Sequence, residues 1–102
     1  MVEKMIYNIE VLFLANNDLH EIHMYLSDFG LSTQKKFRES FDKFINQVSN
    51  MPNMFRKYER NSNYRRAALT FGYLAFYRID KQNNTIKIYR ILHTRQNIDE
   101  LL

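Results

Sequence analysis

His93 and Arg95 stand at the end of an alternating apolar run, IKIYRILHTRQN, which spans residues 86–97. Side chains repeat every two residues along a strand, so a strand that continued this far would place both on one side. There the imidazole could act as general acid or base on a ribose 2′-hydroxyl while the guanidinium held the phosphate. The alternative is a strand-end histidine that bonds only to the backbone, and spacing alone favours that alternative.

Cations and aromatic residues are interleaved between residues 52 and 66. The stretch PNMFRKYERNSNYRR holds Arg56, Lys57, Arg60, Arg65 and Arg66, with Phe55, Tyr58 and Tyr64 between them. Such a mixture can neutralise phosphates and stack bases. The same mixture is expected in any exposed connection between a helix and a strand, so both interpretations stay open.

His20 and His23 lie three residues apart, a spacing that two metal ligands can share on a helix. The chain has no cysteine, and no third ligand accompanies the pair at a recognisable spacing. A Gly-rich phosphate loop, a Ser-His-Asp arrangement and a paired-carboxylate motif are also missing from the sequence. We therefore expect neither a metal nor a cofactor.

The net charge of +4 is unevenly distributed. Residues 1–51 carry five Lys and Arg against seven Asp and Glu, whereas residues 52–102 carry ten against four. A basic half indicates an anionic partner, either nucleic acid or an acidic protein segment. A solvated basic face without a partner fits the charge equally well.

Length and composition indicate one domain over residues 1–102. A hydrophobic content of 45% with two Gly and one Pro is typical of a packed domain. The absence of cysteine suits a reducing cytosol. The apolar run Val11–Ala15 is too short for a signal peptide or a membrane span, so a cytoplasmic protein without a membrane partner is expected.

The chain opens with a run of residues typical of a strand, followed by a run with helical spacing. The β-branched and aromatic run Ile6–Ala15 predicts a first strand. A helix is predicted next, with Asn17 or Asp18 as its cap, Glu21 completing a capping box from Asp18, and Gly30 at its end. Its apolar stripe consists of Leu19, Ile22, Leu26 and Phe29.

A second helix is predicted to begin at LSTQKKF, with Ser32 or Thr33 as its cap, and to end before Pro52. Its apolar stripe consists of Phe37, Phe41, Phe44, Ile45, Val48 and Met51. Adjacent helices with matching stripes predict a helical hairpin that packs on a flat surface.

Three strands are predicted to supply that surface: Tyr64–Gly72, Tyr73–Asp80 and Thr85–His93, joined by turns at Gly72 and at Lys81–Asn84. The segment NIDELL is predicted to form a last helical turn only if it docks through Ile98 and Leu101. The predicted fold class is α+β, with an N-terminal strand and an antiparallel helical hairpin. The hairpin packs on one face of a mainly antiparallel β-sheet that ends in a three-strand meander.

The segments NDLHEIHMYLSDFG, YRRAAL, GYLAFYRID and IKIYRILHTRQNIDELL resemble, in this order, the RelE/ParE toxin superfamily over nearly the whole chain. The most specific part is an aromatic strand of the form G-Y-x-x-x-Y-R-I, a turn, and then I-x-I-x-x-I-x-H-x-R. The H-x-R ending with DELL after it is more similar to the ParE branch than to the RelE branch.

The resemblance implies the toxin of a type II toxin–antitoxin module that arrests growth by inhibiting DNA gyrase and is not itself an enzyme. It implies a cognate acidic antitoxin as partner. The expected target-binding surface consists of Arg65, Arg66, His93 and Arg95, with Arg56, Lys57 and Arg60 as an electrostatic rim.

The RelE branch gives a second hypothesis, a ribosome-dependent mRNA endonuclease in which His93 is acid or base and Arg66 and Arg95 hold the phosphate. RelE-like toxins usually carry an Arg after the Tyr of a GYR motif, where this chain has Leu74. Leucine cannot stabilise the charge of a phosphorane, which argues against RNA cleavage. A third hypothesis is an inactive family member that only binds its antitoxin.

Overall fold

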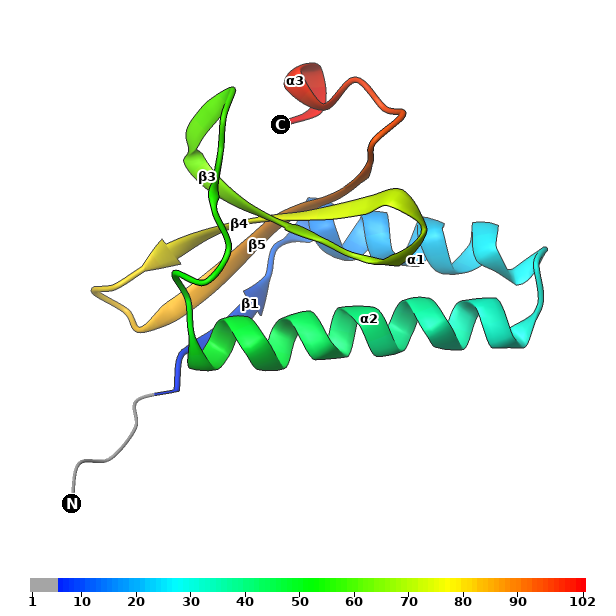
Figure 1. Ribbon diagram of the computed structural model, residues 1–102, viewed down its shortest axis with the longest axis horizontal. Helices are drawn as coiled ribbons and strands as arrows, with labels where there is room; N and C mark the ends of the chain where they lie inside the picture. The colour runs from blue at the N-terminus through cyan, green and yellow to red at the C-terminus, as the bar shows by residue number, and fades with distance from the viewer. Residues whose placement is uncertain (1–5) are drawn as a thin grey trace.

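The computed structural model describes residues 6–102 and has two layers, a twisted β-sheet and a helical hairpin on one of its faces (Figure 1). The elements in chain order are β1 (Asn8–Val11), α1 (Phe13–Ser27), α2 (Leu31–Asn50), β2 (Lys57–Tyr58), β3 (Asn61–Ala68), the 3-10 turn η1 (Thr70–Gly72), β4 (Tyr73–Asp80), β5 (Thr85–His93) and α3 (Ile98–Leu101).

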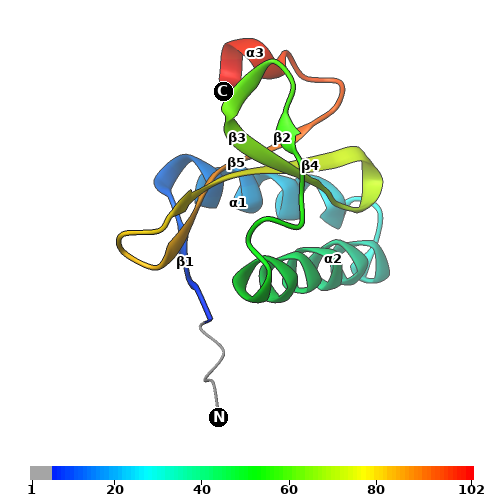
Figure 2. The ribbon, with the colours of Figure 1, turned by 60° about the vertical axis from the view of Figure 1, so that its left-hand side comes forward.

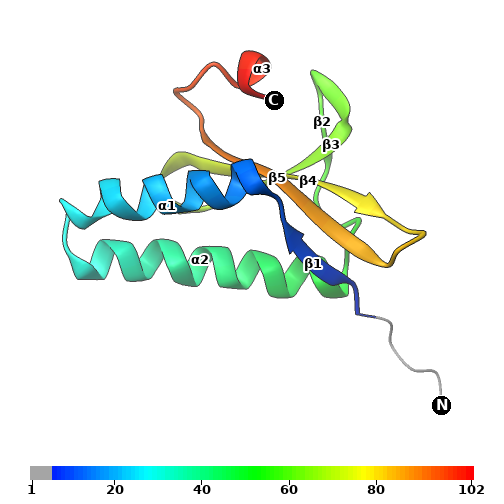
Figure 3. The same cartoon turned by 180° about the vertical axis from the view of Figure 1, so that it is seen from behind.

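The sheet has the strand order β1-β5-β4-β3-β2. Neighbouring strands are antiparallel except for β1, which runs parallel to β5 with Asn8 opposite Thr85 and Val11 opposite Ile88 (Figure 3). The predicted α+β class and the meander of β3, β4 and β5 are confirmed. The short edge strand β2 was not predicted, because two residues carry no usable alternation.

The first predicted strand is too long. Strand β1 ends at Val11, the Leu12 N–H donates to the Ile88 carbonyl, and α1 begins at Phe13. The prediction that Asn17 or Asp18 caps this helix is therefore wrong, and Leu12 occupies the cap position without a side-chain hydrogen bond. The apolar run misled the prediction because Phe13 is 81% exposed while Ala15 is buried, which is a helical and not an alternating pattern.

The second helix begins at Leu31, before both of its predicted caps. Gly30, at a φ of +98°, makes the turn that ends one helix and starts the next, a backbone conformation that favours glycine. Neither Ser32 nor Thr33 caps α2, and the Thr33 hydroxyl donates to the Phe29 carbonyl. The predicted end is confirmed, since α2 stops at Asn50, two residues before Pro52.

The main core lies between the hairpin and the inner face of the sheet. Its buried side chains include Ile22, Leu26, Phe37, Phe41, Phe44 and Val48 from the helices and Tyr77, Ile86, Ile88 and Ile91 from the strands. Both predicted stripes are thus confirmed except at their ends, because Phe29 and Met51 are 59% and 58% exposed. At these ends the helices extend past the sheet surface that buries the rest.

A smaller core lies on the outer face, where α3 covers the sheet on the side away from the hairpin (Figure 2). Ile98 and Leu102 pack there against four buried side chains, Tyr58, Leu74, Phe76 and Leu92. The predicted docking of this last turn is therefore confirmed for Ile98 and wrong for Leu101, which is 39% exposed.

The junction between β3 and β4 differs from the predicted turn. The strand ends at Ala68, and residues 70–72 form η1, in which Phe71 and Gly72 have φ values of +59° and +80°. Gly72 does make the turn, as predicted. The segment from Leu69 to Gly72, which we expected to be strand, is not.

A β-bulge interrupts the pairing of β4 with β5. Phe76 lies opposite Arg90 and Tyr77 lies opposite Ile88, so Tyr89 is an extra residue without a partner on β4. Phe76 belongs to the outer core and Ile88 and Ile91 to the inner core, so Tyr89 and Arg90 both lie on the outer side. The bulge therefore changes which side chains of β5 face the hairpin.

Candidate functional site

His93 ends β5, and the backbone engages both of its ring nitrogens. Nε2 lies 3.0 Å from the Phe71 carbonyl oxygen, and Nδ1 accepts a hydrogen bond of 3.1 Å from the Arg95 N–H. This arrangement fits a neutral imidazole with its proton on Nε2. The ring also packs edge-on against Tyr73 at a centroid distance of 4.9 Å. The geometry is that of the strand-end histidine, the alternative that spacing favoured.

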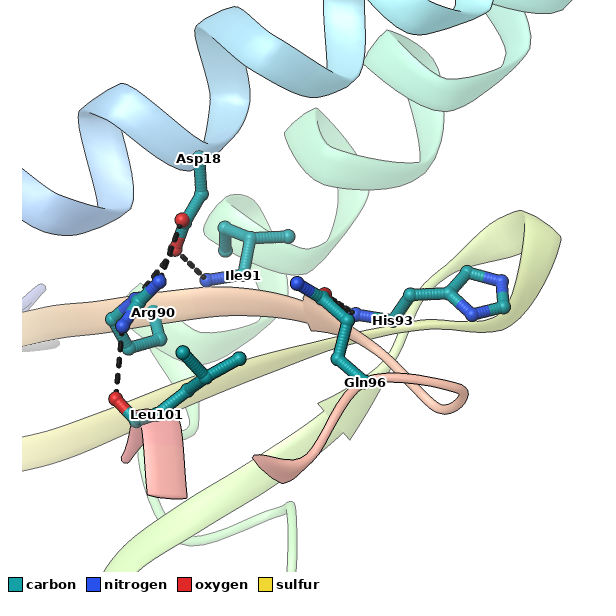
Figure 4. Close-up of polar contacts among 6 residues, drawn as sticks. All are labelled: Asp18, Arg90, Ile91, His93, Gln96 and Leu101. Atoms are coloured by element: carbon teal, nitrogen blue, oxygen red, sulfur yellow. Dashed lines mark hydrogen bonds and ion pairs between the residues drawn. The ribbon is translucent and has the colours of Figure 1, made fainter. Parts of the chain in front are cut away.

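The backbone N–H and carbonyl of His93 both form hydrogen bonds with Gln96, as they would with a neighbouring strand. The His93 N–H donates to Oε1 of Gln96 at 2.6 Å, and the His93 carbonyl accepts from the Gln96 N–H at 2.9 Å (Figure 4). Satisfying both groups shields the end of β5, which β1 is too short to cover. The loop after β5 is thereby fixed next to the imidazole.

A groove of about 680 Å³ lies between α1, η1 and the end of β5. Both His93 and Arg95 line it, although the strand stops at His93 and Arg95 belongs to the following turn. Aromatic side chains form much of its wall, with Tyr25 58%, Phe29 59% and Phe71 42% exposed. The groove thus combines exposed aromatic surface with a guanidinium at its rim.

Asp18, a buried acid of α1, also lines the groove. Its two carboxylate oxygens accept from Nε and Nη2 of Arg90 at 2.8 and 2.9 Å, and the Ile91 N–H donates to it at 2.9 Å (Figure 4). Nη1 of Arg90 donates to the Leu101 carbonyl at 2.8 Å. The hydrogen bonds that Arg90 donates to Asp18 are the main cause that raises the pKa of Arg90 above its ordinary value.

This ion pair was not recognised in the sequence, where Asp18 was assigned to a helix cap. A signal did exist, since Asp18 follows Ala15 by three residues and precedes Ile22 by four, which places it on the buried side of a helix. A carboxylate on that side needs a cation or several donors. The partner could not be found, because Arg90 is 72 residues away.

Arg65 and Arg66 are consecutive residues of β3 and therefore point to opposite faces of the sheet. Arg65 is paired with Tyr77 of the inner core, and its Nη1 donates to the Phe55 carbonyl at 2.7 Å. Arg66 is paired with Phe76 of the outer core and lies 3.6 Å from Glu59. The structure does not bring these two residues and His93 into one patch.

The predicted electrostatic rim is partly neutralised by carboxylates. Arg56 lies 3.3 Å from Glu59, and Arg60 lies 2.9 Å from Asp99, which also accepts from the Tyr58 hydroxyl at 3.1 Å. Lys57 is exposed. The rim and the tail are thus joined, because Asp99 belongs to α3.

Leu74, where RelE-like relatives were expected to carry Arg, is only 9% exposed. It belongs to the outer core beneath α3. This position accommodates an apolar side chain, and a guanidinium there would have to displace the tail.

The two histidines of α1 are exposed and apart from the groove, and His23 bonds to Gln34. Within residues 6–102 no three His, Asp or Glu side chains gather in a way that could hold a metal ion. The helices in this part of the chain are also too short or too polar to cross a membrane.

A family model described as the ParE toxin of the type II toxin–antitoxin system parDE matches residues 9–98. No curated protein matches the sequence. Among solved structures, the chain is similar to one from the chromosomal ParDE system of P. aeruginosa, with 18% identity and a TM-score of 0.70, covering 89% of this chain and 98% of that chain.

Two further structures share the fold. The toxin–antitoxin complex RelBE2 from Mycobacterium tuberculosis matches with 20% identity and a TM-score of 0.62, covering 92% of this chain and 98% of that one. A mutant of the E. coli toxin RelE in the free state matches with 14% identity and a TM-score of 0.68, covering 96% of this chain and 100% of that one. At these identities the likeness concerns the fold alone.

Proposed function

The chain belongs to the ParE toxin family of type II toxin–antitoxin systems, and we propose that it arrests growth by inhibiting DNA gyrase until a cognate acidic antitoxin neutralises it. The observation that carries this proposal is the family match over residues 9–98. Two similar structures come from a toxin–antitoxin system or complex, which supports an antitoxin partner for this chain as well. Gyrase as the target places the action in the cytoplasm.

The groove beside β5 supports action by protein contact. Tyr25, Phe29 and Phe71 expose aromatic surface in a concave site, and exposed apolar patches of this kind mark interaction surfaces. Arg95 at the rim adds a cation, and Arg and Tyr are enriched among the residues that dominate binding energies. We assign Arg95 to direct target contact and His93 to the positioning of the loop that carries it.

The remaining predicted surface residues suit a role in attracting an acidic partner. Arg65 and Arg66 of β3 and the rim of Arg56, Lys57 and Arg60 in and beside β2 belong to the half of the chain with a positive net charge. Basic surface of this kind accelerates association with an acidic segment. These residues contribute to the capture of the antitoxin on this proposal, while the groove engages the target.

The hypothesis of an mRNA endonuclease has less support in the geometry of its candidate residues. Proton transfer needs an imidazole nitrogen that can reach the substrate, whereas both nitrogens of His93 are engaged by backbone groups. Leu74 lies under α3 where a phosphate-binding Arg was expected. On this proposal the toxin acts by protein contact and not as an enzyme.

A supercoiling and DNA-cleavage assay with purified gyrase tests the proposal. We expect loss of supercoiling or accumulation of cleaved DNA, reversed by antitoxin. Arg95→Glu should abolish the effect, and the matched control Lys81→Glu should retain it, because Lys81 lies in the β4–β5 turn at the other end of the same hairpin.

No effect of the wild-type chain at a large excess over gyrase would refute the target. Cleavage of mRNA on ribosomes would then support the endonuclease hypothesis. Antitoxin binding without growth arrest would instead identify a member that only binds its antitoxin.

A further inference from the structure

On the outer face, Arg78 of β4 lies over two tyrosine rings, Tyr64 of β3 and Tyr89 of β5. Its guanidinium carbon is 5.5 Å from the centroid of each ring. The two rings meet edge to face at 82°, with centroids 5.3 Å apart. We propose that this cluster binds a carboxylate side chain of the antitoxin, an inference that rests on the proposed function.

The bulge in β5 is what assembles the cluster. Arg78 is the residue next to Tyr77, whose side chain is in the inner core, so Arg78 faces outward. Tyr64 faces outward in the same row, because its neighbour Arg65 is paired with Tyr77. Tyr89, the extra residue of the bulge, completes the group from the third strand. Bulges often aim a side chain toward a functional surface.

The guanidinium of Arg78 is available to a ligand. Arg78 is exposed, and no carboxylate within residues 6–102 lies at ion-pair distance from it. Asp80, two residues further along β4, already has a partner and lies 3.6 Å from Lys87, and Glu59 lies 3.6 Å from Arg66. Arg78 is thus an unpaired cation among paired ones on this face.

Contact with two aromatic faces also orients the guanidinium. Cation–π contact holds the guanidinium beside the two rings without using its N–H donors in hydrogen bonds. A guanidinium can donate two parallel N–H hydrogen bonds to one carboxylate, a bidentate pair that Lys cannot form. The ligand class is therefore a planar oxyanion that approaches the face from solvent.

A protein carboxylate fits this site better than a nucleic acid does. Binding to a phosphate backbone draws its affinity from several cations at once. Here the neighbouring cations Arg66, Lys87 and Arg90 are paired with carboxylates of the chain itself, which leaves one guanidinium. One oriented Arg between two Tyr side chains has instead the composition of a hot spot in a protein interface.

Calorimetric titration of the full chain with its cognate antitoxin tests the site. A charge-assisted hydrogen bond is worth about 1.5–3 kcal/mol, so Arg78→Gln should weaken binding about tenfold or more. Arg78→Lys keeps the positive charge but cannot donate two hydrogen bonds to one carboxylate. It should therefore weaken binding almost as much as Arg78→Gln does. The matched control Lys81→Gln, which removes one exposed cation from the neighbouring turn, should change affinity less than about twofold.

Unchanged affinity in both Arg78→Gln and Arg78→Lys would overturn the inference and leave the proposed function intact. An equal loss in Lys81→Gln would also overturn it, since general attraction would then explain the binding. Binding of a single-stranded oligonucleotide that Arg78→Gln abolishes would assign the cluster to nucleic acid instead. If the wild-type chain binds no antitoxin, the proposed function itself fails.

Discussion

Asp18 and Arg90 connect the two faces of the sheet around the edge of β5. Asp18 comes from the hairpin side, and Arg90 continues to the Leu101 carbonyl of the tail on the outer side. The side chains are only 10% and 15% exposed, so the pair lies in a poorly hydrated environment. The carboxylate also occupies the Ile91 N–H, beyond the point where β1 stops pairing.

Asp18→Ala should strongly destabilise the protein, because it leaves the Arg90 guanidinium and the Ile91 N–H without their acceptor. Removing one partner of a buried pair costs about 3 kcal/mol or more. Asp18→Asn should cost less, since an amide oxygen can still accept from Ile91. Urea unfolding measures both, and Glu59→Ala, which removes a carboxylate that is 60% exposed, should stay within about 1 kcal/mol of wild type. Equal losses for Asp18→Ala and Glu59→Ala would show that the pair is not structurally important.

Stability should fall in alkaline solution through Tyr77. Burial raises the pKa of Tyr77 to about 12, above its usual value of 10.0. The unfolded chain therefore ionises first, so stability is intact below about pH 10 and is lost as the pH rises toward about 12, by about 2 kcal/mol.

Comparison with Tyr77→Phe tests this origin of the alkaline loss. The variant should be less stable near pH 8 by about 1 kcal/mol, because the hydroxyl no longer donates to the Pro52 carbonyl. It should also show a shallower decline between pH 10 and 12 in urea unfolding. Burial also raises the pKa of Tyr73, which accounts for a residual slope. Parallel curves for the two proteins would contradict the assignment.

Leu74→Arg should destabilise the outer core without creating a nuclease. The new guanidinium would enter a site that is 9% exposed, which costs about 2 kcal/mol or more and should release α3. Hydrogen exchange of residues 98–101 and an mRNA cleavage assay on ribosomes are the measurements. Leu74→Met, an apolar substitution of similar volume, should leave the tail protected. Gain of mRNA cleavage in Leu74→Arg would favour the endonuclease hypothesis.

His93→Ala should reduce stability and leave mRNA intact. The substitution removes the ring contacts with Phe71 and Arg95, worth about 1–2 kcal/mol in total. Growth arrest should weaken only in part, because Arg95 remains. A growth assay with mRNA analysis distinguishes the cases: cleavage by the wild type that His93→Ala abolishes would contradict the contact mechanism.

The sequence was sufficient where local periodicity determines the structure. Phe37, Phe41 and Phe44 repeat at helical spacing and are buried, and Gly72 turns the chain as its type indicates. It was insufficient at Phe13, because a short apolar run fits a strand or a helix equally well. Pairing with β5 determines where the strand ends, because β5 pairs with β1 only as far as Val11.

The candidate site could also be predicted from the sequence only in part. Both His93 and Arg95 line the groove, but not for the predicted reason, because the strand ends at His93 and Arg95 belongs to the following turn. The Asp18–Arg90 pair and the Tyr89 bulge did not follow, since each depends on which residues of distant segments become neighbours. A two-residue period has no means of signalling one extra residue in a strand.

The parallel pairing of β1 with β5 has a consequence for the order of folding. Asn8 has to find Thr85 across 77 residues, so this contact forms against a large loop-closure entropy. The apolar face of the hairpin stays only partly covered during synthesis until residues 85–93, which supply Ile86, Ile88 and Ile91 to the core, have left the ribosome. The groove beside His93 is made from both α1 and β5, so a nascent chain that has not yet added its last strand has no surface with which to engage a target.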